Sequence, residues 1–372
     1  MSVDFNLTEE QEVIQKSVRE FLEKEAKTVA RDAEETEEGY SPQLWQKMAD
    51  LGWMGISFPE EYGGNEGNII DLLILLEEMG KMLVPGPFIP AVVCSGHGIL
   101  KYGTSAQKKK FLPGLTKGRL CVIPALTEPL SVPAGGALKE EVNLRNGNHV
   151  FSGTRLFVPY AHLADWLLYG ATTNKGKTLF LVDAKSTGIH LNILKTIASD
   201  KQYEVVLEGV EVPRENILGE MGRGEEIIQD MREWGAICQC GFILGLLEQV
   251  LRMSVDYAKK REQFGSPIGS FQAIQHHAAN MATDVEQVKF LTYQAAWRLS
   301  ESLPATKEIS MAKARASDAS RRVCLLGTKI HGGIGIIVDY DMQLYFRRAK
   351  AAELAFGDGD FHREVIAQQL GL

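Results

Sequence analysis

The sequence is short of cysteine and of net positive charge, and each shortage excludes a class of protein. Its 372 residues contain five cysteines, without the paired spacing of a disulfide framework or a zinc site: Cys94, Cys121, Cys238, Cys240 and Cys324. Lysine and arginine number 40 against 48 acidic residues, which gives a net charge of −8. No basic block is present to bind nucleic-acid phosphates. We therefore expect buried free thiols and no nucleic-acid partner.

Secretory, membrane and metal-binding signals are missing as well. The first residues, MSVDFNLTEEQEVIQ, are acidic and amphipathic and lack the apolar core of a signal peptide. By inspection, no apolar run reaches the length of a membrane span. His276, His277 and His331 have no acid or cysteine at the spacing of metal ligands. The sequence thus predicts a cytoplasmic protein with no membrane partner and no metal centre.

The hydrophobic pattern of the first 118 residues predicts helices. The length of the chain is too great for one core, and its 45% apolar and 24% charged content is ordinary for a globular protein. Ser41 and Pro42 begin one predicted helix, which stops at Gly52. Residues 69–83 are apolar nearly all round, which indicates a buried helix. Another helix has one apolar stripe, made of Val13, Ile14, Val18, Phe21 and Leu22.

Residues 119–222 change in character, and residues 223–372 change back. In the middle block, β-branched and aromatic runs are punctuated by Gly, Asn, Asp and Pro, at residues 149–160, 165–172, 177–184 and 203–213. This block predicts a small β-barrel or sandwich of seven or eight strands. The last block has long helical patterns at 224–261 and 271–302, as in a helical bundle. The predicted fold class is α+β, mostly α.

Three stretches have residue types suited to ligand binding, and each also has a plain structural reading. Thr127, in ALTEPLSVPAGG, either binds an anionic or carbonyl-rich ligand or simply enters a strand. Arg261, in KKREQFGS, is either a phosphate contact or a helix-terminal surface arginine. Gly332 and Gly333, in KIHGGIGI, either let a ligand approach the backbone or end a helix. They do not follow a strand, so they are not a dinucleotide-binding fingerprint.

Taken in order, these stretches resemble the acyl-CoA dehydrogenase family over essentially the whole chain. The resemblance is carried by LTEEQ, WQKMADLGWMGISFPEEYGG, LTEP, VEVPRENILGE, YAKKREQFGSPIGSFQAIQ and KIHGGIG. It implies an N-terminal helical domain (1–118), a middle β-domain (119–222) and a C-terminal four-helix bundle (223–372). It also implies FAD between the β-domain and the bundle, with an acyl-CoA thioester against the flavin. A base removes the α-proton, the β-hydrogen leaves as hydride, and an electron-transfer flavoprotein takes the electrons.

The resemblance assigns roles to individual residues. On the flavin it places Leu126 and Thr127, with Phe157 and Val158 beside the ring. Along the FAD of a neighbouring subunit it places Arg261, Phe264, Gln272, Lys329, Ile330, Gly332 and Gly333, and it gives Asp358 a cofactor-side position. With the CoA thioester it places Arg232, Phe356 and Gly357. The sequence departs from the family pattern at three places. Residues 130–133 replace a Gly-x-Gly-Ser loop, Pro159 stands where a hydroxyl residue is usual, and Lys329 stands where glutamine is common.

The catalytic base is the largest departure. The family's tail, in which Tyr-Glu-Gly-Thr carries the base, fits residues 347–367 without a gap and places its glutamate on Phe356. Some relatives carry the base on a bundle helix, at the position that we match to Met231. Neither Phe nor Met can take a proton.

Three explanations stay open for this loss. Another residue of the chain acts as base, the candidates being Glu233, Asp230, Asp358, Asp360 and His97; on a helix, Glu233 and Asp230 point about 200° and about 100° away from Met231. Alternatively, the partner chain of an α2β2 heterotetramer supplies the base. Or the reaction needs no base, as in the elimination of a β-sulfinate.

The resemblance therefore predicts an FAD-dependent oxidoreductase of unusual substrate. It would act on a cyclic, branched or otherwise bulky acyl-CoA, as a homotetramer or as half of an α2β2 heterotetramer. The arginine that dicarboxylate-specific members use is replaced by the stretch 84–87, Val-Pro-Gly-Pro, so a terminal carboxylate has no evident partner. We expect the ring of Phe356 to lie over the flavin end of the substrate pocket.

Overall fold

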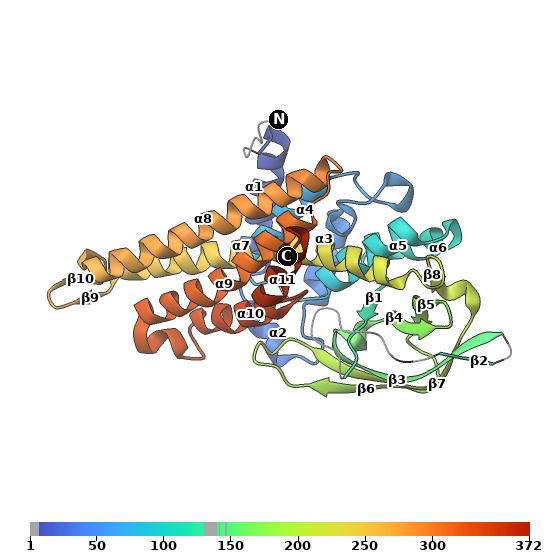
Figure 1. Ribbon diagram of the computed structural model, residues 1–372. Helices are drawn as coiled ribbons and strands as arrows, with labels where there is room; N and C mark the ends of the chain where they lie inside the picture. The colour runs from blue at the N-terminus through green and yellow to red at the C-terminus, as the bar shows by residue number, and fades with distance from the viewer. Residues whose placement is uncertain (1–6, 130–139, 141, 146) are drawn as a thin grey trace. The chain divides into compact units, whose positions relative to one another are not determined.

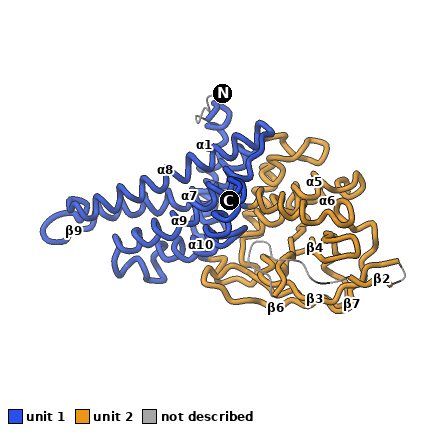
Figure 2. The backbone as a smooth tube through the Cα atoms, viewed as in Figure 1, with its two compact units in different colours: residues 1–31, 68–84, 236–372 blue, residues 32–67, 85–235 orange. Residues whose placement is uncertain are grey.

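The computed structural model describes residues 7–129, 140, 142–145 and 147–372 (Figure 1). The substituted loop at residues 130–133 lies outside the described residues. The chain divides into two compact units (Figure 2). Unit 1 comprises residues 1–31, 68–84 and 236–372, and unit 2 comprises residues 32–67 and 85–235. The long helix α7, Gly224–Lys260, contributes its first part to unit 2 and the rest to unit 1.

Unit 1 is a bundle of long helices. Besides most of α7, it contains α1 (Glu9–Glu25), α4 (Ile69–Lys81), α8 (Gln272–Ser300), α9 (Thr306–His331), α10 (Met342–Leu354) and α11 (Gly359–Gln369). A short hairpin, β9 (Glu262–Gln263) with β10 (Ser266–Pro267), joins α7 to α8, and the turn η7 (Gly332–Ile336) follows α9. Helix α9 packs against α8, α10 and α11 and so forms the centre of this part of the bundle.

Helices α4 and α7 cross closely because glycines stand at the contact. A Cβ atom at Gly80 would lie 2.0 Å from the carbonyl oxygen of Phe242, and one at Gly245 would lie 1.8 Å from that of Glu77. No other residue type fits these positions without moving a backbone. As the apolar pattern predicts, α4 is buried along nearly its whole length.

Two sequence expectations in the helices were wrong. Val13 is 68% exposed, because α1 buries Gln11, Val18 and Leu22, and Val13 points about 140° away from Val18. Helix α7 is long and apolar enough to cross a membrane by length and composition, although no such run was expected. Most of its apolar stretch is buried inside the protein, as in a core helix.

Unit 2 combines helices with two small sheets. The helical elements are α3 (Pro42–Asp50), η1 (Trp53–Gly55), η2 (Glu60–Tyr62), the π-helix η3 (Phe88–Gly96), α5 (His97–Tyr102), α6 (Ser105–Thr116), η4 (Ala161–Leu163) and η5 (Arg214–Asn216). Ser41 caps α3 with Pro42 at its first position, as predicted. The short helix α2 (Val29–Glu35) spans the boundary between the two units.

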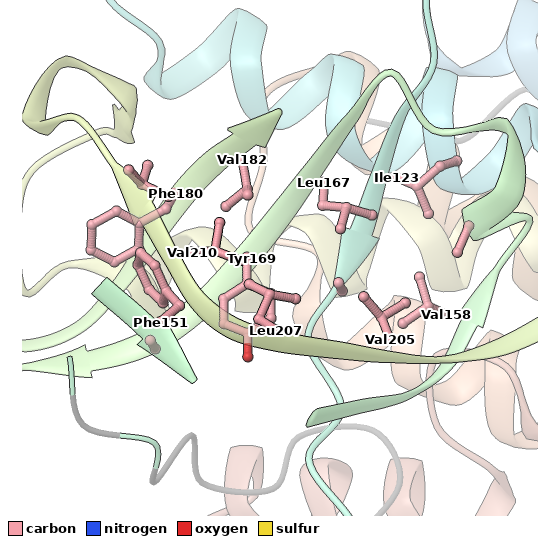
Figure 3. Close-up of a cluster of buried hydrophobic side chains, with 14 of the residues drawn as sticks. Ile123, Phe151, Val158, Leu167, Tyr169, Phe180, Val182, Val205, Leu207 and Val210 are labelled. Atoms are coloured by element: carbon pink, nitrogen blue, oxygen red, sulfur yellow. The ribbon is translucent and has the colours of Figure 1, made fainter. Parts of the chain in front are cut away.

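Among the described residues of unit 2, eight strands form two four-stranded sheets. One sheet has the order β1 (Val122–Ala125), β4 (Trp166–Thr173), β5 (Gly176–Asp183), β8 (Ile217–Leu218). The other has the order β2 (Asn143–Arg145), β3 (Asn148–Pro159), β7 (Gln202–Val212), β6 (Ile189–Leu194). One buried cluster draws on both sheets, with the ring of Phe151 against those of Tyr169 and Phe180 (Figure 3).

The order of elements confirms the predicted fold class. The described chain is mostly helical, with a sheet-containing segment between two helical segments. The five cysteines are free, as expected; four are buried, and Cys121 is half-buried.

Candidate functional site

In unit 2, the structure brings together the two segments that the resemblance places on the flavin. Strand β1 leads into Leu126 and Thr127, and the carbonyl oxygen of Thr127 accepts a hydrogen bond of 2.8 Å from the backbone N–H of Leu156. The pairing of β3 with β7 shifts register between Arg155 and Val158. Such bulges re-aim side chains and are frequent beside active sites.

The bulge turns one predicted residue outward and the next inward. Phe157 has a φ angle of 54° and is 59% exposed, which is unusual for an aromatic residue in a strand. Val158 is buried among the apolar side chains of the sheets. The surface of these two hydrogen-bonded segments thus carries the hydroxyl of Thr127, which is half-buried, and the exposed ring of Phe157. This surface suits a flat, carbonyl-bearing ring system.

In unit 1, a second group of predicted residues lies on the hairpin between α7 and α8 (Figure 1). Arg261 follows the last residue of α7 and is exposed. Phe264 and Gly265 both have positive φ, as a two-residue turn of this kind requires. Phe264 is 94% exposed and contacts Phe271 edge-on, and Gln272 begins α8. A cation and an uncovered ring on one hairpin suit a ligand with a phosphate and an aromatic group.

The segment after α9 is open on its glycine side. A Cβ atom at Gly332 or Gly333 would meet no atom within 4 Å, and Lys329 is exposed. The side chain of Ile330 is buried, so only its backbone is placed to meet a ligand. His331 stacks on Tyr257 and bonds the carbonyl oxygen of Gly327, and burial lowers its pKa. These contacts fit a structural histidine.

Phe356 lies in the turn between α10 and α11. Its φ angle is 59° and that of Gly357 is 101°. Asp358 is the N-cap of α11, and its Oδ1 accepts a 2.9 Å hydrogen bond from the N–H of Phe361. His362 lies with Nε2 3.1 Å from the carbonyl oxygen of Phe356. The turn therefore has defined bonds at its carbonyls and at its cap.

A buried lysine of α9 completes this turn. Lys313 is fully buried, and its Nζ donates to the carbonyl oxygens of Gly357 at 2.7 Å and Glu353 at 2.9 Å and to Ser317 Oγ at 3.1 Å. Three acceptors match the three hydrogens of an ammonium group. A cation at the C-terminal end of α10 also interacts favourably with the helix dipole. Desolvation lowers the pKa of Lys313 to about 8.

The second base position and its neighbours lie on the first part of α7, in unit 2. Met231 is buried, and a Cβ atom at Gly98 would lie 3.2 Å from its Sδ. Arg232 donates to Gln229 Oε1, and burial lowers the pKa of its guanidinium. Glu233 Oε1 accepts a hydrogen bond from Gln229 Nε2 at 2.8 Å. Arg232 and Glu233 thus share one polar surface of the helix.

Two candidate base residues form a pair in unit 2. His97 Nε2 lies 3.0 Å from Asp230 Oδ2, and Lys101 Nζ lies 2.6 Å from Asp230 Oδ1. The imidazole stacks on Trp234 with ring centroids 4.0 Å apart. Burial alone would raise the pKa of Asp230, but the hydrogen bonds from His97 and Lys101 hold it below its ordinary value. An ionised Asp230 accepts from Nε2–H and leaves Nδ1 as the ring's proton acceptor.

Two buried cations were missed by the sequence reasoning. Lys313 stands among small and apolar residues, two positions before Arg315, in ISMAKARAS, and Arg155 stands at an inward position of a strand in GTRLFVP. A single charge on a face that the hydrophobic pattern buries is the signal that could have revealed them. Within the described ranges, no group of three or more His, Cys, Asp or Glu side chains is arranged to hold a metal ion.

Comparisons with known proteins give a consistent result. The family model "Acyl-CoA dehydrogenase, N-terminal domain" matches residues 8–119, and "Acyl-CoA dehydrogenase, C-terminal domain" matches residues 222–371. The chain is 33% identical to acryloyl-CoA reductase (NADH) of Anaerotignum propionicum, over 99% of this chain and 96% of that protein.

Two solved structures are similar over nearly their whole length. One is described as the electron transferring flavoprotein of Acidaminococcus fermentans, with 32% identity, a TM-score of 0.92 and 99% of each chain covered. The other is described as the ChsE4-ChsE5 complex from Mycobacterium tuberculosis, with 27% identity, a TM-score of 0.90 and 99% of each chain covered.

The titration of Lys313 predicts a specific pH dependence of stability. Because its folded pKa of about 8 lies below the ordinary value of 10.5, the unfolded chain binds more protons between these pH values. The stability contributed by this group therefore rises as the pH rises through that range. We expect the difference in unfolding free energy between the wild type and Lys313→Met to grow in favour of the wild type from pH 8 to pH 10.

Urea denaturation of both proteins at several pH values measures this difference. The matched control is Lys109→Met, since Lys109 is exposed and its removal should leave the pH profile unchanged. Parallel profiles for the wild type and Lys313→Met would contradict the prediction.

Proposed function

The chain belongs to the acyl-CoA dehydrogenase family of FAD-dependent oxidoreductases, and from this premise we propose its reaction and the source of its base. We propose that it acts at the α and β carbons of a bulky acyl-CoA thioester, with no carboxylate at position 356 of the α10–α11 turn. The observation that supports this most is the turn itself, which is firmly bonded and carries Phe356.

The residues present fit FAD. Thr127 and the exposed Phe157 offer a hydroxyl and an aromatic face for a ring with carbonyls, and Arg261 and Phe264 offer a cation and a ring for a phosphate and a base. When bound, FAD supplies the acceptor for the β-hydride. Hydrogen bonds to the thioester oxygen would stabilise the charge that develops as the α-proton leaves.

For the base on this chain, we propose His97. Asp230 fixes its orientation, and the neutral imidazole then has one nitrogen free to take a proton. Glu233 is hydrogen-bonded to Gln229, and Asp358 serves as a helix cap. The His97–Asp230 pair is therefore the arrangement on this chain that most resembles an oriented general base.

A second candidate function follows from the two apolar base positions. Phe356 and Met231 both lack a proton acceptor, and a similar structure is described as a complex of two named proteins, ChsE4 and ChsE5. In this reading the chain is one half of an α2β2 heterotetramer, whose other chain supplies the glutamate. Electron transfer to an electron-transferring flavoprotein is proposed for either reading, since such a protein is named for a similar structure. The oligomeric state and the cytoplasmic location stay predictions.

Exchange of the α-proton with solvent separates the two sources of base. If His97 is the base, the pure homo-oligomer in deuterium oxide exchanges the α-proton of a bound acyl-CoA thioester, and His97→Gln reduces the rate by about 10²-fold or more. Lys101→Met is the control, because it keeps the His97–Asp230 pair. If the pure chain exchanges nothing but a glutamate-containing partner restores exchange, the heterotetramer is supported and His97 is excluded as base.

FAD binding should depend on Arg261. Replacing Arg261 by alanine removes a charge-assisted phosphate contact of roughly 1.5–3 kcal/mol, which corresponds to about 10- to 100-fold in Kd. Titration of FAD into the apoprotein, followed by flavin fluorescence, measures the change. Arg252→Ala is the matched control, since Arg252 is an exposed arginine of α7, the helix that Arg261 follows. A colourless wild type that takes up no added FAD would refute the proposed cofactor site.

A glutamate at position 356 should act as a base. Because the turn is bonded through its backbone, Phe356→Glu should fold and place a carboxylate where relatives carry theirs. We expect α-proton exchange of simple saturated acyl-CoA thioesters to rise by about 10²–10⁴-fold over the wild type. The carboxyl pKa should be raised by partial burial, and some stability should be lost.

Phe356→Gln is the matched control for that substitution, because it has the size of glutamate but takes no proton. The readout is deuterium incorporation at the α-carbon, measured by mass spectrometry. If Phe356→Glu folds, holds FAD and gives no more exchange than Phe356→Gln, residue 356 does not lie at the base position.

A further inference from the structure

A fully buried guanidinium lies beneath the flavin-contacting segments of unit 2. Arg155 is 1% exposed, although arginine is rarely buried without partners. Its Nη1 lies 2.9 Å from Glu140 Oε2 and donates to the carbonyl oxygen of Thr154. Its Nη2 donates to the carbonyl oxygen of Gly170 and lies 3.5 Å from Glu128 Oε1.

The groups around Arg155 are themselves bonded to one another. Its guanidinium carbon lies 4.1 Å from the centroid of the Tyr169 ring, and the Tyr169 hydroxyl donates to Glu140 Oε2 at 2.5 Å. The backbone N–H of Glu140 donates to Glu128 Oε1 at 3.0 Å. A buried cation is tolerated only when its surroundings supply such acceptors. Arg155, its two carboxylate partners, the Tyr169 hydroxyl and the two backbone carbonyls therefore form one network.

This network is placed to fix two separate segments. Glu128 directly follows Thr127, so the Arg155–Glu128 contact restrains the end of the segment Leu126–Thr127. Arg155 also precedes the bulge, and the next residue, Leu156, holds the carbonyl oxygen of Thr127. The same side chain therefore anchors the base of the bulge that turns Phe157 outward.

Glu140 connects the network to the sheet that contains β4. Its carbonyl oxygen accepts a 2.8 Å hydrogen bond from the N–H of Thr172 in β4. Tyr169 and Gly170 are residues of β4 as well. The network thereby holds Leu126–Thr127 and the bulge in place relative to the rigid sheet that contains β4.

We propose that Arg155 is a positioning residue, which sets the spacing between Leu126–Thr127 and Phe157–Val158 and so shapes the flavin surface of this chain. The proposal rests on the proposed FAD function. Arg155 touches no part of the cofactor in this role. It acts through the backbone of the two segments that do.

The test compares variants of Arg155 by FAD binding and by the flavin spectrum. Arg155→Met removes the charge, and Arg155→Lys keeps it but cannot bond both carboxylates with a planar fork. We expect Arg155→Met to weaken FAD binding by about tenfold or more, the factor equivalent to ~1.4 kcal/mol. Arg155→Lys should lie between this variant and the wild type, and both should shift the absorption maxima of bound FAD.

Thr178→Val is the matched control for general loss of stability. Thr178 is fully buried in β5 of the same unit and bonds the N–H of Gly222, away from both flavin segments. The Thr178→Val substitution should lower the unfolding temperature of the apoprotein without a change in the flavin spectrum. If Arg155→Met does not fold, Arg155→Lys carries the same comparison, since it keeps the buried charge.

The outcomes separate this proposal from the one on which it rests. A wild type that binds no FAD overturns the proposed function and this role with it. A wild type that binds FAD, with Arg155→Lys matching it in Kd and spectrum, overturns only the role of Arg155. Equal spectral shifts in Arg155→Lys and Thr178→Val likewise reduce Arg155 to a structural residue.

Discussion

The shape of the α10–α11 turn depends on one buried ammonium group. A helix leaves its last carbonyl oxygens without partners in the helix, and here Lys313 of the neighbouring α9 bonds that of Glu353 in α10, together with the carbonyl oxygen of Gly357 in the turn. Helix α9 packs against α8, α10 and α11, and the side chain of Lys313 is fully buried. Its charge is accommodated because the turn supplies oxygens, and the turn is fixed because the charge needs them.

Arg155 shows the same relation in unit 2. There a buried guanidinium collects carbonyl and carboxylate oxygens from segments that are distant in sequence. In both units a buried cation bonds oxygens in or beside a segment that the resemblance assigns to a ligand. Neither stretch depends on the identity of the side chain that it presents, because the bonds involve backbone oxygens and flanking residues. The printed bonds to the carbonyl oxygens of Phe356 and Gly357 therefore do not require a particular side chain at position 356.

The sequence predicted those features that follow from local pattern. Helix α4 and the start of α3 were predicted because an all-apolar run and a Ser-Pro cap are read over a few residues. The burial of Ile330 and the exposure of Val13 were not predicted, because they depend on which face of a helix meets a neighbour. The pairing of His97 with Asp230 joins residues 133 positions apart, and no local signal reports it. The resemblance named Thr127 and Phe157 separately, and the folded sheet brings them together.

Phe356 is held in a backbone conformation that L-residues avoid. A left-handed φ of 59° costs about 1–2 kcal/mol for a residue with a Cβ atom, and a buried hydrogen bond returns about 1 kcal/mol. The bonds of Lys313 and His362 to the carbonyl oxygens of Gly357 and Phe356 are enough to offset that strain. Glutamate at this half-buried position would meet the same strain and, in addition, part of the cost of desolvating a carboxylate. Phenylalanine removes the second cost and, with it, the capacity to take a proton. The bonds that hold this turn involve backbone oxygens and not the side chain at position 356, so under the proposed function the base comes from another position or from another chain.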